Sequence, residues 1–243
     1  MVEKNPGPVS GTDPLRATLE RLRNRPPAPA EVNGDDAAER ARREQAVLRL
    51  AHQLGPRYAP GRVQPDGFEL YHPDQGVALA AVKAFADGIT ARVEAGDGLL
   101  LHGPVGTGKD RLLAWLLYRA AWSGYAAAWV NGQTLFAESR DAMDTGRRES
   151  EFLAHWTAPR VLGISDPLPP AGAPSAWNLT LLGRLLDERY RALRPTWFTL
   201  NVAGSGEAER KLSAPVFDRI IDGAEVVPCF WPSYRKPRSG MRE

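Results

Sequence analysis

The sequence contains one cysteine, Cys229, among 243 residues. A single cysteine excludes an internal disulfide framework and a zinc module built from several cysteines, and in its apolar surroundings we expect a packed core thiol. No apolar run approaches the roughly 18 residues that a membrane-spanning helix needs, and no secretory signal is visible. The sequence therefore predicts a cytoplasmic protein without a membrane partner.

An excess of charge of one sign is also missing. The formal net charge is +2, with 25% charged and 43% hydrophobic residues. This composition is typical of a globular protein with one sizeable core plus appendages. The slightly positive charge is compatible with binding to nucleic acid but does not require it.

Residues 103–110, which read GPVGTGKD, are the most informative segment of the chain. Glycines allow consecutive backbone N–H groups to curl around phosphate oxygens, and Lys109 would reach the phosphates. A buried-strand pattern precedes the segment at residues 98–102, and a helical pattern follows at residues 111–118. We therefore predict a phosphate-binding P-loop, the alternative being a glycine loop with a surface lysine. The expected nucleotide-binding residues are Gly103, Pro104, Val105, Gly106, Thr107, Gly108, Lys109, Asp110 and Arg111.

Asp110 departs from the P-loop pattern. This position normally carries Ser or Thr, whose hydroxyl binds Mg²⁺. A carboxylate is also a magnesium ligand. Without the cation, however, it would repel the phosphates by roughly 4 kcal/mol at 4 Å and an effective dielectric of 20. The sequence therefore predicts that nucleotide binding without Mg²⁺ is weak.

A second departure lies in the candidate acidic strand, residues 161–166, which reads VLGISD. If residues 161–164 form the strand, Ser165 takes the position of the metal-associated acid and Asp166 that of the acid that polarises the attacking water. In the alternative register, Asp166 is the metal-associated acid and Pro167 occupies the catalytic position. We favour the first register.

The two departures suggest an exchange. The P-loop would carry a carboxylate, on Asp110, where a hydroxyl is usual, and the acidic strand would carry a hydroxyl, on Ser165, where a carboxylate is usual. The total charge around the cation would be unchanged. The predicted metal-binding residues are therefore Asp110, Ser165 and Asp166. The alternative is a degenerate site in a former ATPase that has kept its fold.

Strand-like and helix-like segments alternate along the chain, which predicts an α/β fold with a parallel sheet between two layers of helices. The region at residues 1–35 is predicted to be a disordered tail, residues 36–62 a basic helical segment, and residues 63–243 the nucleotide-binding domain. One apolar face of a helix at residues 176–193 is marked by Leu179, Leu182, Leu185, Leu186 and Tyr190. We expect strands at residues 98–102, 126–130, 161–164, 196–201 and 224–230. We expect helices at residues 36–54, 74–94, 111–118, 134–143, 149–156, 176–193 and 214–221.

Residues 68–236 resemble the AAA+ ATPases of the DnaC/IstB type, which include bacterial helicase loaders. The resemblance rests on residues 98–109, on LDERY at 186–190 with RPT at 194–196, on VFDRI at 216–220, and on WPSYR at 231–235. It implies a P-loop NTPase of the AAA+ fold that uses ATP and Mg²⁺ and forms a homo-oligomer on nucleotide or DNA. It also implies that Asn201 senses the γ-phosphate and that Arg219 is an arginine finger acting on a neighbouring subunit. From the residues alone, Asn201 could instead cap a turn, and Arg219 could pair with Asp218 or Asp222.

The expected function is that of a helicase loader, which couples ATP binding and hydrolysis to the handling of single-stranded DNA and a replicative helicase. Asp166, Asn201 and Arg219 are the expected catalytic residues. The alternatives are an ATPase that assists a transposase, and a scaffold that binds nucleotide without hydrolysing it. ATP hydrolysis itself is the open question, because both metal-side positions are atypical.

Overall fold

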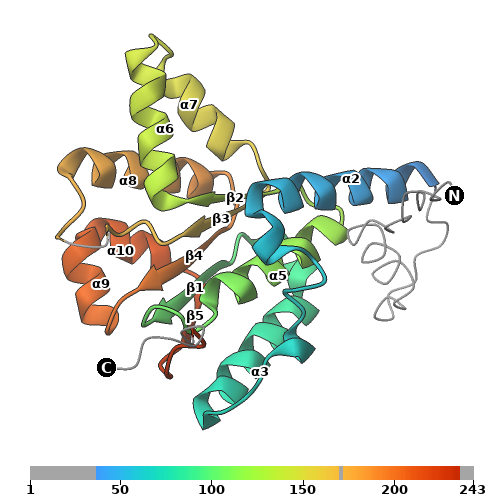
Figure 1. Cartoon of the computed structure of the whole chain (residues 1–243). Coiled ribbons are helices and arrows are strands. Elements are labelled where there is room, and N and C mark those ends of the chain that lie inside the picture. Colours follow the sequence, from blue (N-terminus) through green and yellow to red (C-terminus); the bar gives the residue numbers. More distant parts are fainter. Residues whose placement is uncertain (1–36, 170–171, 236–243) are drawn as a thin grey trace, which may run out of the picture.

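A computed structural model describes residues 37–169 and 172–235 (Figure 1). The tail predicted to be disordered, residues 1–35, lies outside the described residues. In the described part of the chain, no helix is both long enough and apolar enough to cross a bilayer.

Five parallel strands form one sheet in the order β2-β3-β4-β1-β5. Apolar residues fill the central strands, as is typical of a sheet that is covered on both faces. Because all the strands run in the same direction, their carboxyl ends meet at one edge of the sheet. The strands are β1 (Gly98–Gly103), β2 (Ala127–Asn131), β3 (Val161–Ser165), β4 (Thr196–Asn201) and β5 (Ala224–Pro228).

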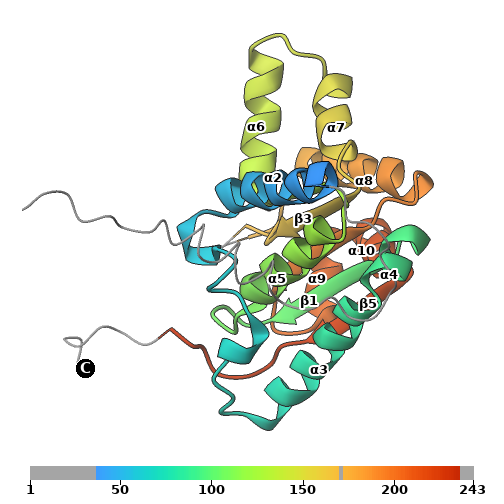
Figure 2. The ribbon, with the colours of Figure 1, turned by 90° about the vertical axis from the view of Figure 1, so that its right-hand side faces the viewer.

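Two layers of helices cover the sheet (Figures 1 and 2). Alternate residues of each strand point to opposite faces: Trp197 of β4 joins the core beneath the first layer, and Phe198 joins the core beneath the second. The predicted three-layer α/β fold is therefore confirmed. The first layer contains α2 (Ala37–Leu54), α3 (Pro73–Asp87), α4 (Ile89–Ala95) and α5 (Lys109–Trp122). The second contains α6 (Gly132–Asp144), α7 (Glu149–Thr157), α8 (Ala176–Arg191), α9 (Ser205–Leu212) and α10 (Ala214–Ile221).

Helix α2 packs directly on α5 and β2. Val47, Leu50 and Leu54 are buried in the core that it shares with α5, and Gln53 accepts a hydrogen bond from the backbone of Trp129 in β2 at 3.0 Å. The basic residues Arg42 and Arg49 lie on the exposed face. The domain boundary at residue 62 stays a prediction.

Three details of the structure differ from the expectations. The helix expected at residues 74–94 is broken at Gly88, which ends α3 and precedes α4; glycine costs about 1 kcal/mol in a helix interior, so a break there is inexpensive. Helix α9 was not expected, because its apolar positions are few. In α8, Tyr190 was expected on the buried face but is 50% exposed, whereas its neighbour Arg189 is fully buried.

Candidate nucleotide-binding site

The P-loop follows β1 at the carboxyl edge of the sheet, and α5 begins directly after it at Lys109. Gly106 and Gly108 adopt positive φ angles of 86° and 90°, which favour glycine. A Cβ on Gly106 would lie 2.0 Å from Ser233 Oγ, so a larger residue there would require Ser233 to shift. The loop therefore presents its backbone and the N-terminus of α5, the arrangement that binds phosphate in proteins.

Lys109 is 4% exposed and folds back onto its own loop. Its Nζ donates to the carbonyl oxygens of Gly103 at 2.9 Å and Pro104 at 2.6 Å, and to Thr107 Oγ1 at 3.3 Å. Burial lowers the pKa of Lys109, and the nearby Asp110 and Asp166 carboxylates oppose this shift. The ammonium group is thus held where the loop would surround a phosphate.

Asp110 binds two hydroxyl groups from the neighbouring strands. Its Oδ1 accepts hydrogen bonds from Ser165 Oγ of β3 at 2.8 Å and from Thr199 Oγ1 of β4 at 2.6 Å. Ser165 and Thr199 are buried and face each other in the parallel ladder. The two residues of the predicted exchange, Asp110 and Ser165, are therefore in direct contact.

Thr199 is not among the site residues predicted from the sequence. A signal was available: Thr199 lies two residues before Asn201 on the same strand, so both side chains point to the face that α5 covers.

Asp166 follows β3 with a φ of 48°, a left-handed conformation that Asp tolerates. Its backbone N–H donates to Thr199 O at 2.9 Å, and its Oδ2 accepts from Asn201 Nδ2 at 2.5 Å. Burial raises the pKa of Asp166, and the bonds with Asn201 oppose this shift. Asp166 Oδ1 is buried and has no hydrogen-bond donor among the described residues, which leaves one carboxylate oxygen available at the site.

Arg111, expected to contact nucleotide, is held by the segment that precedes α3. Its Nη2 donates to Gln64 O at 3.1 Å, and its guanidinium lies 4.1 Å from the centre of the Phe68 ring. Tyr58 lies near the same end of α5: burial and the Asp110 carboxylate raise its pKa. Pro104 and Val105 are exposed at the tip of the loop.

Arg219 lies at the opposite edge of the sheet. Together with Gly98 and Thr196, the first residues of β1 and β4, it lines a small surface cavity. Its Nε donates to Asp187 Oδ1 at 2.7 Å, and its guanidinium lies 4.8 Å from the centre of the Tyr190 ring. Asp187, rather than Asp218 or Asp222, is its ion-pair partner. Arg219 is thus separated by the length of the sheet from the P-loop of its own chain.

The side chains around Asp110 fit a small, hard cation. Carboxylate and hydroxyl oxygens are ligands that Mg²⁺ accepts, and the unpartnered Oδ1 of Asp166 adds another oxygen nearby. No group of three or more His, Cys, Asp or Glu side chains suited to a metal occurs in the described part of the chain. A magnesium site here would therefore depend on the hydroxyl groups.

Neither a protein-family model nor a curated protein matches the sequence. Among solved structures, the DnaC helicase loader is 22% identical over 72% of this chain and 99% of that chain, with a TM-score of 0.63. DnaI is 25% identical over 74% of this chain and 94% of that chain, with a TM-score of 0.57. The replication initiator DnaA bound to AMPPCP and single-stranded DNA is 16% identical over 72% of this chain but only 50% of that chain, with a TM-score of 0.58. The chain therefore has an AAA+ fold of the DnaC type.

Proposed function

We propose that this chain is an ATP-binding AAA+ protein of the helicase-loader type, which couples ATP to the handling of single-stranded DNA and a replicative helicase. The observation that carries the proposal is the contact of Asp110 with Ser165 and Thr199 beside the P-loop lysine. The likeness to structures of a helicase loader and of an initiator bound to AMPPCP and single-stranded DNA supports the choice of ligand and partner.

Each polar group of the site has a role in this proposal. The loop amides and Lys109 would bind the phosphates, and Asp110 and Ser165 would hold Mg²⁺, which would neutralise phosphate charge. Asp166 Oδ1 accepts the proton of the attacking water, because its raised pKa and missing partner suit a general base. Asn201 orients that water or the γ-phosphate through the amide that now binds Asp166.

The proposal is tested by titrating purified protein with ATP in a calorimeter, with Mg²⁺ and with EDTA, and by measuring hydrolysis with and without single-stranded DNA. We expect binding that requires Mg²⁺ and turnover that DNA stimulates. Lys109→Ala is expected to abolish both. Binding without turnover would favour the scaffold alternative, and no binding in the wild-type protein would mean a degenerate site.

A double-mutant cycle tests the exchanged metal site. Asp110→Thr removes the carboxylate that lies closest to Ser165 and Thr199, so we expect Mg²⁺-dependent ATP binding to weaken by about tenfold or more. Adding Ser165→Asp restores a carboxylate to this contact, now on β3 instead of α5. The affinity for Mg·ATP is expected to recover to within about threefold of the wild-type value. The readout is the dissociation constant in Mg²⁺ and in EDTA.

Ser165→Asp alone is the control for this cycle. It places two carboxylates in contact, so like-charge repulsion is expected to weaken folding without Mg²⁺. If the losses of ATP affinity in the two single variants simply add in the double variant, the exchange is refuted.

A further inference from the structure

The carbonyl groups of the P-loop need hydrogen-bond donors. When loop amides turn toward a phosphate, the carbonyls point away from it, and buried carbonyls are almost always paired. Four of them fall into two groups. Those of Gly103 and Pro104 accept from Lys109 Nζ, at 2.9 and 2.6 Å, and also from Val202 N and Thr107 Oγ1, both at 3.2 Å. Those of Gly106 and Thr107 accept from residues 231–234, which we call the C-terminal strap.

The C-terminal strap supplies two donors. The N–H of Tyr234 donates to Gly106 O at 2.9 Å, and the indole Nε1 of Trp231 donates to Thr107 O at 3.0 Å. Both Trp231 and Thr107 are buried, at 5% and 0% exposure. Strand β5 delivers the strap to this position, because Cys229 N still bonds to His102 O of β1 at 2.7 Å.

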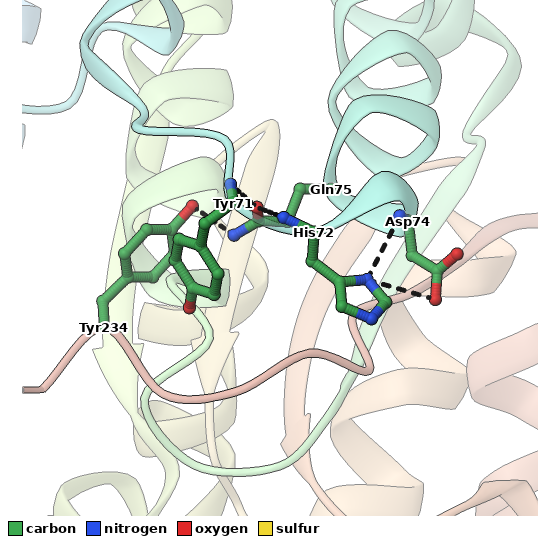
Figure 3. A network of polar contacts seen from close by, with 5 residues as sticks. All are labelled: Tyr71, His72, Asp74, Gln75 and Tyr234. Atoms are coloured by element: carbon green, nitrogen blue, oxygen red, sulfur yellow. Dashed lines mark hydrogen bonds and ion pairs between the residues drawn. The ribbon is translucent and has the colours of Figure 1, made fainter.

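The far end of the strap is anchored at the start of α3 (Figure 3). Gln75 is 2% exposed; its Nε2 donates to the Tyr234 hydroxyl at 2.7 Å, while its Oε1 accepts from the backbone of Tyr71 and His72. The Tyr234 hydroxyl donates in turn to Glu69 O at 3.0 Å. The Tyr71 ring packs edge-on against Tyr234, and its hydroxyl bonds to the carbonyl of Pro232. The strap is therefore fixed at both ends.

The two groups of donors differ in what nucleotide would do to them. A phosphate in the loop would draw Lys109 Nζ away from the Gly103 and Pro104 carbonyls, because the ammonium group binds the anion more strongly. The donors of the strap carry no charge, and their acceptors face away from the ligand. They therefore stay in place when Lys109 leaves.

We propose that Trp231 and the C-terminal strap are positioning residues of the nucleotide site, which keep Gly106 and Thr107 in the phosphate-binding conformation without touching the phosphate. The inference rests on the proposed binding of nucleotide. It assigns a role in ligand affinity to a segment that lies more than 120 residues after the loop in the sequence.

The test compares two tryptophan variants. Trp231→Phe keeps an aromatic ring but removes the donor to Thr107. Trp156→Phe, in α7, is the matched control, because Trp156 is equally buried and its Nε1 has no hydrogen-bond acceptor among the described residues. Titration with Mg·ATP and with inorganic tripolyphosphate is expected to show a three- to tenfold loss of affinity for both ligands in Trp231→Phe, about the value of one hydrogen bond. Trp156→Phe is expected to bind as the wild type does.

Tyr234→Phe is a milder variant that decides the question if Trp231→Phe does not fold. It frees the far end of the strap from Gln75 and Glu69, and about a twofold loss of affinity is expected. Tyr125→Phe, which removes a surface bond to Glu94, is its control.

The outcomes separate the two proposals. A wild-type protein that binds neither ligand overturns the proposed function and this inference with it. Wild-type binding that Trp231→Phe and Tyr234→Phe leave unchanged overturns the inference alone. An equal loss in Trp156→Phe would also overturn it, since that loss would reflect core packing.

Discussion

Arg189→Met is expected to lower the free energy of unfolding by about 3–5 kcal/mol, one of the largest effects available in this chain. Arg189 is fully buried at the end of α8, and none of its hydrogen-bond partners in the described part of the chain is a carboxylate. Its guanidinium instead donates to Trp156 O, Thr157 O, Pro159 O, Arg160 O, Pro195 O and Thr196 Oγ1, at distances from 2.7 to 3.4 Å. Methionine fills similar space but donates no hydrogen bond. Pro195 O keeps a bond from Leu162 N and Thr157 O keeps one from Arg194 Nη1, but each buried acceptor that is left without a donor costs about 1–3 kcal/mol before water or relaxation compensates.

The position of Arg189 connects this stability to the candidate site. One set of its acceptors lies at the end of α7 and in the loop that leads into β3, and the other lies where β4 begins. Those two strands carry Ser165 and Thr199 to Asp110. Burial, with repulsion from Arg194 and Arg160, lowers the pKa of Arg189 to about 9. The group therefore still carries its charge at neutral pH, and the backbone carbonyl dipoles stabilise it.

Urea denaturation of Arg189→Met and Arg191→Ala measures this effect. Arg191 lies two residues away on the exposed side of α8, and among the described residues it donates only to its own helix, to Asp187 O at 3.2 Å. Its loss is expected to change stability by less than about 0.5 kcal/mol. Arg189→Lys keeps the charge but not the planar set of donors, so we expect an intermediate loss. Equal denaturation midpoints for Arg189→Met and Arg191→Ala would contradict the prediction.

The sequence predicts those parts of the site that depend on the common direction of the parallel strands. Once parallel strands are assigned, the carboxyl ends of the strands must meet at one edge of the sheet, and the P-loop, Asp166 and Asn201 all lie at such ends. The pairing of Asp110 with Ser165 followed from two departures from a pattern at that same edge.

The features that the sequence did not predict depend on contacts between residues that are far apart along the chain. Arg189 lies among leucines at helical spacing, and an arginine in such a pattern is normally assigned to solvent. The acceptors at residues 156–160 and 195–196 make its burial favourable. The C-terminal strap has a recognisable sequence, WPSYR at residues 231–235. That sequence does not indicate which loop the indole N–H of Trp231 will bond. Such contacts require the order of the strands, which periodicity does not give.

Arg219→Ala is expected to lower ATP turnover by about 10³-fold or more while leaving ATP affinity unchanged. Arg219 lies at the edge of the sheet opposite to its own P-loop, so any effect on hydrolysis must be exerted on the nucleotide of a neighbouring subunit. In the single chain its guanidinium is held by Asp187 and by the face of Tyr190. This surface pair is weak enough for a phosphate to replace it.

Mixing two inactive variants distinguishes action in trans from a structural effect. Lys109→Ala subunits lack a working P-loop but keep Arg219, and Arg219→Ala subunits have the reverse defect. In an equimolar mixed oligomer roughly a quarter of the interfaces join an intact P-loop to an intact Arg219, so turnover is expected to return toward that fraction of wild type. Arg184→Ala, which breaks a similar exposed pair with Glu149, is expected to keep wild-type turnover. If the mixture stays inactive although it forms oligomers, Arg219 does not act across an interface, and its pairing with Asp187 is then a structural contact only.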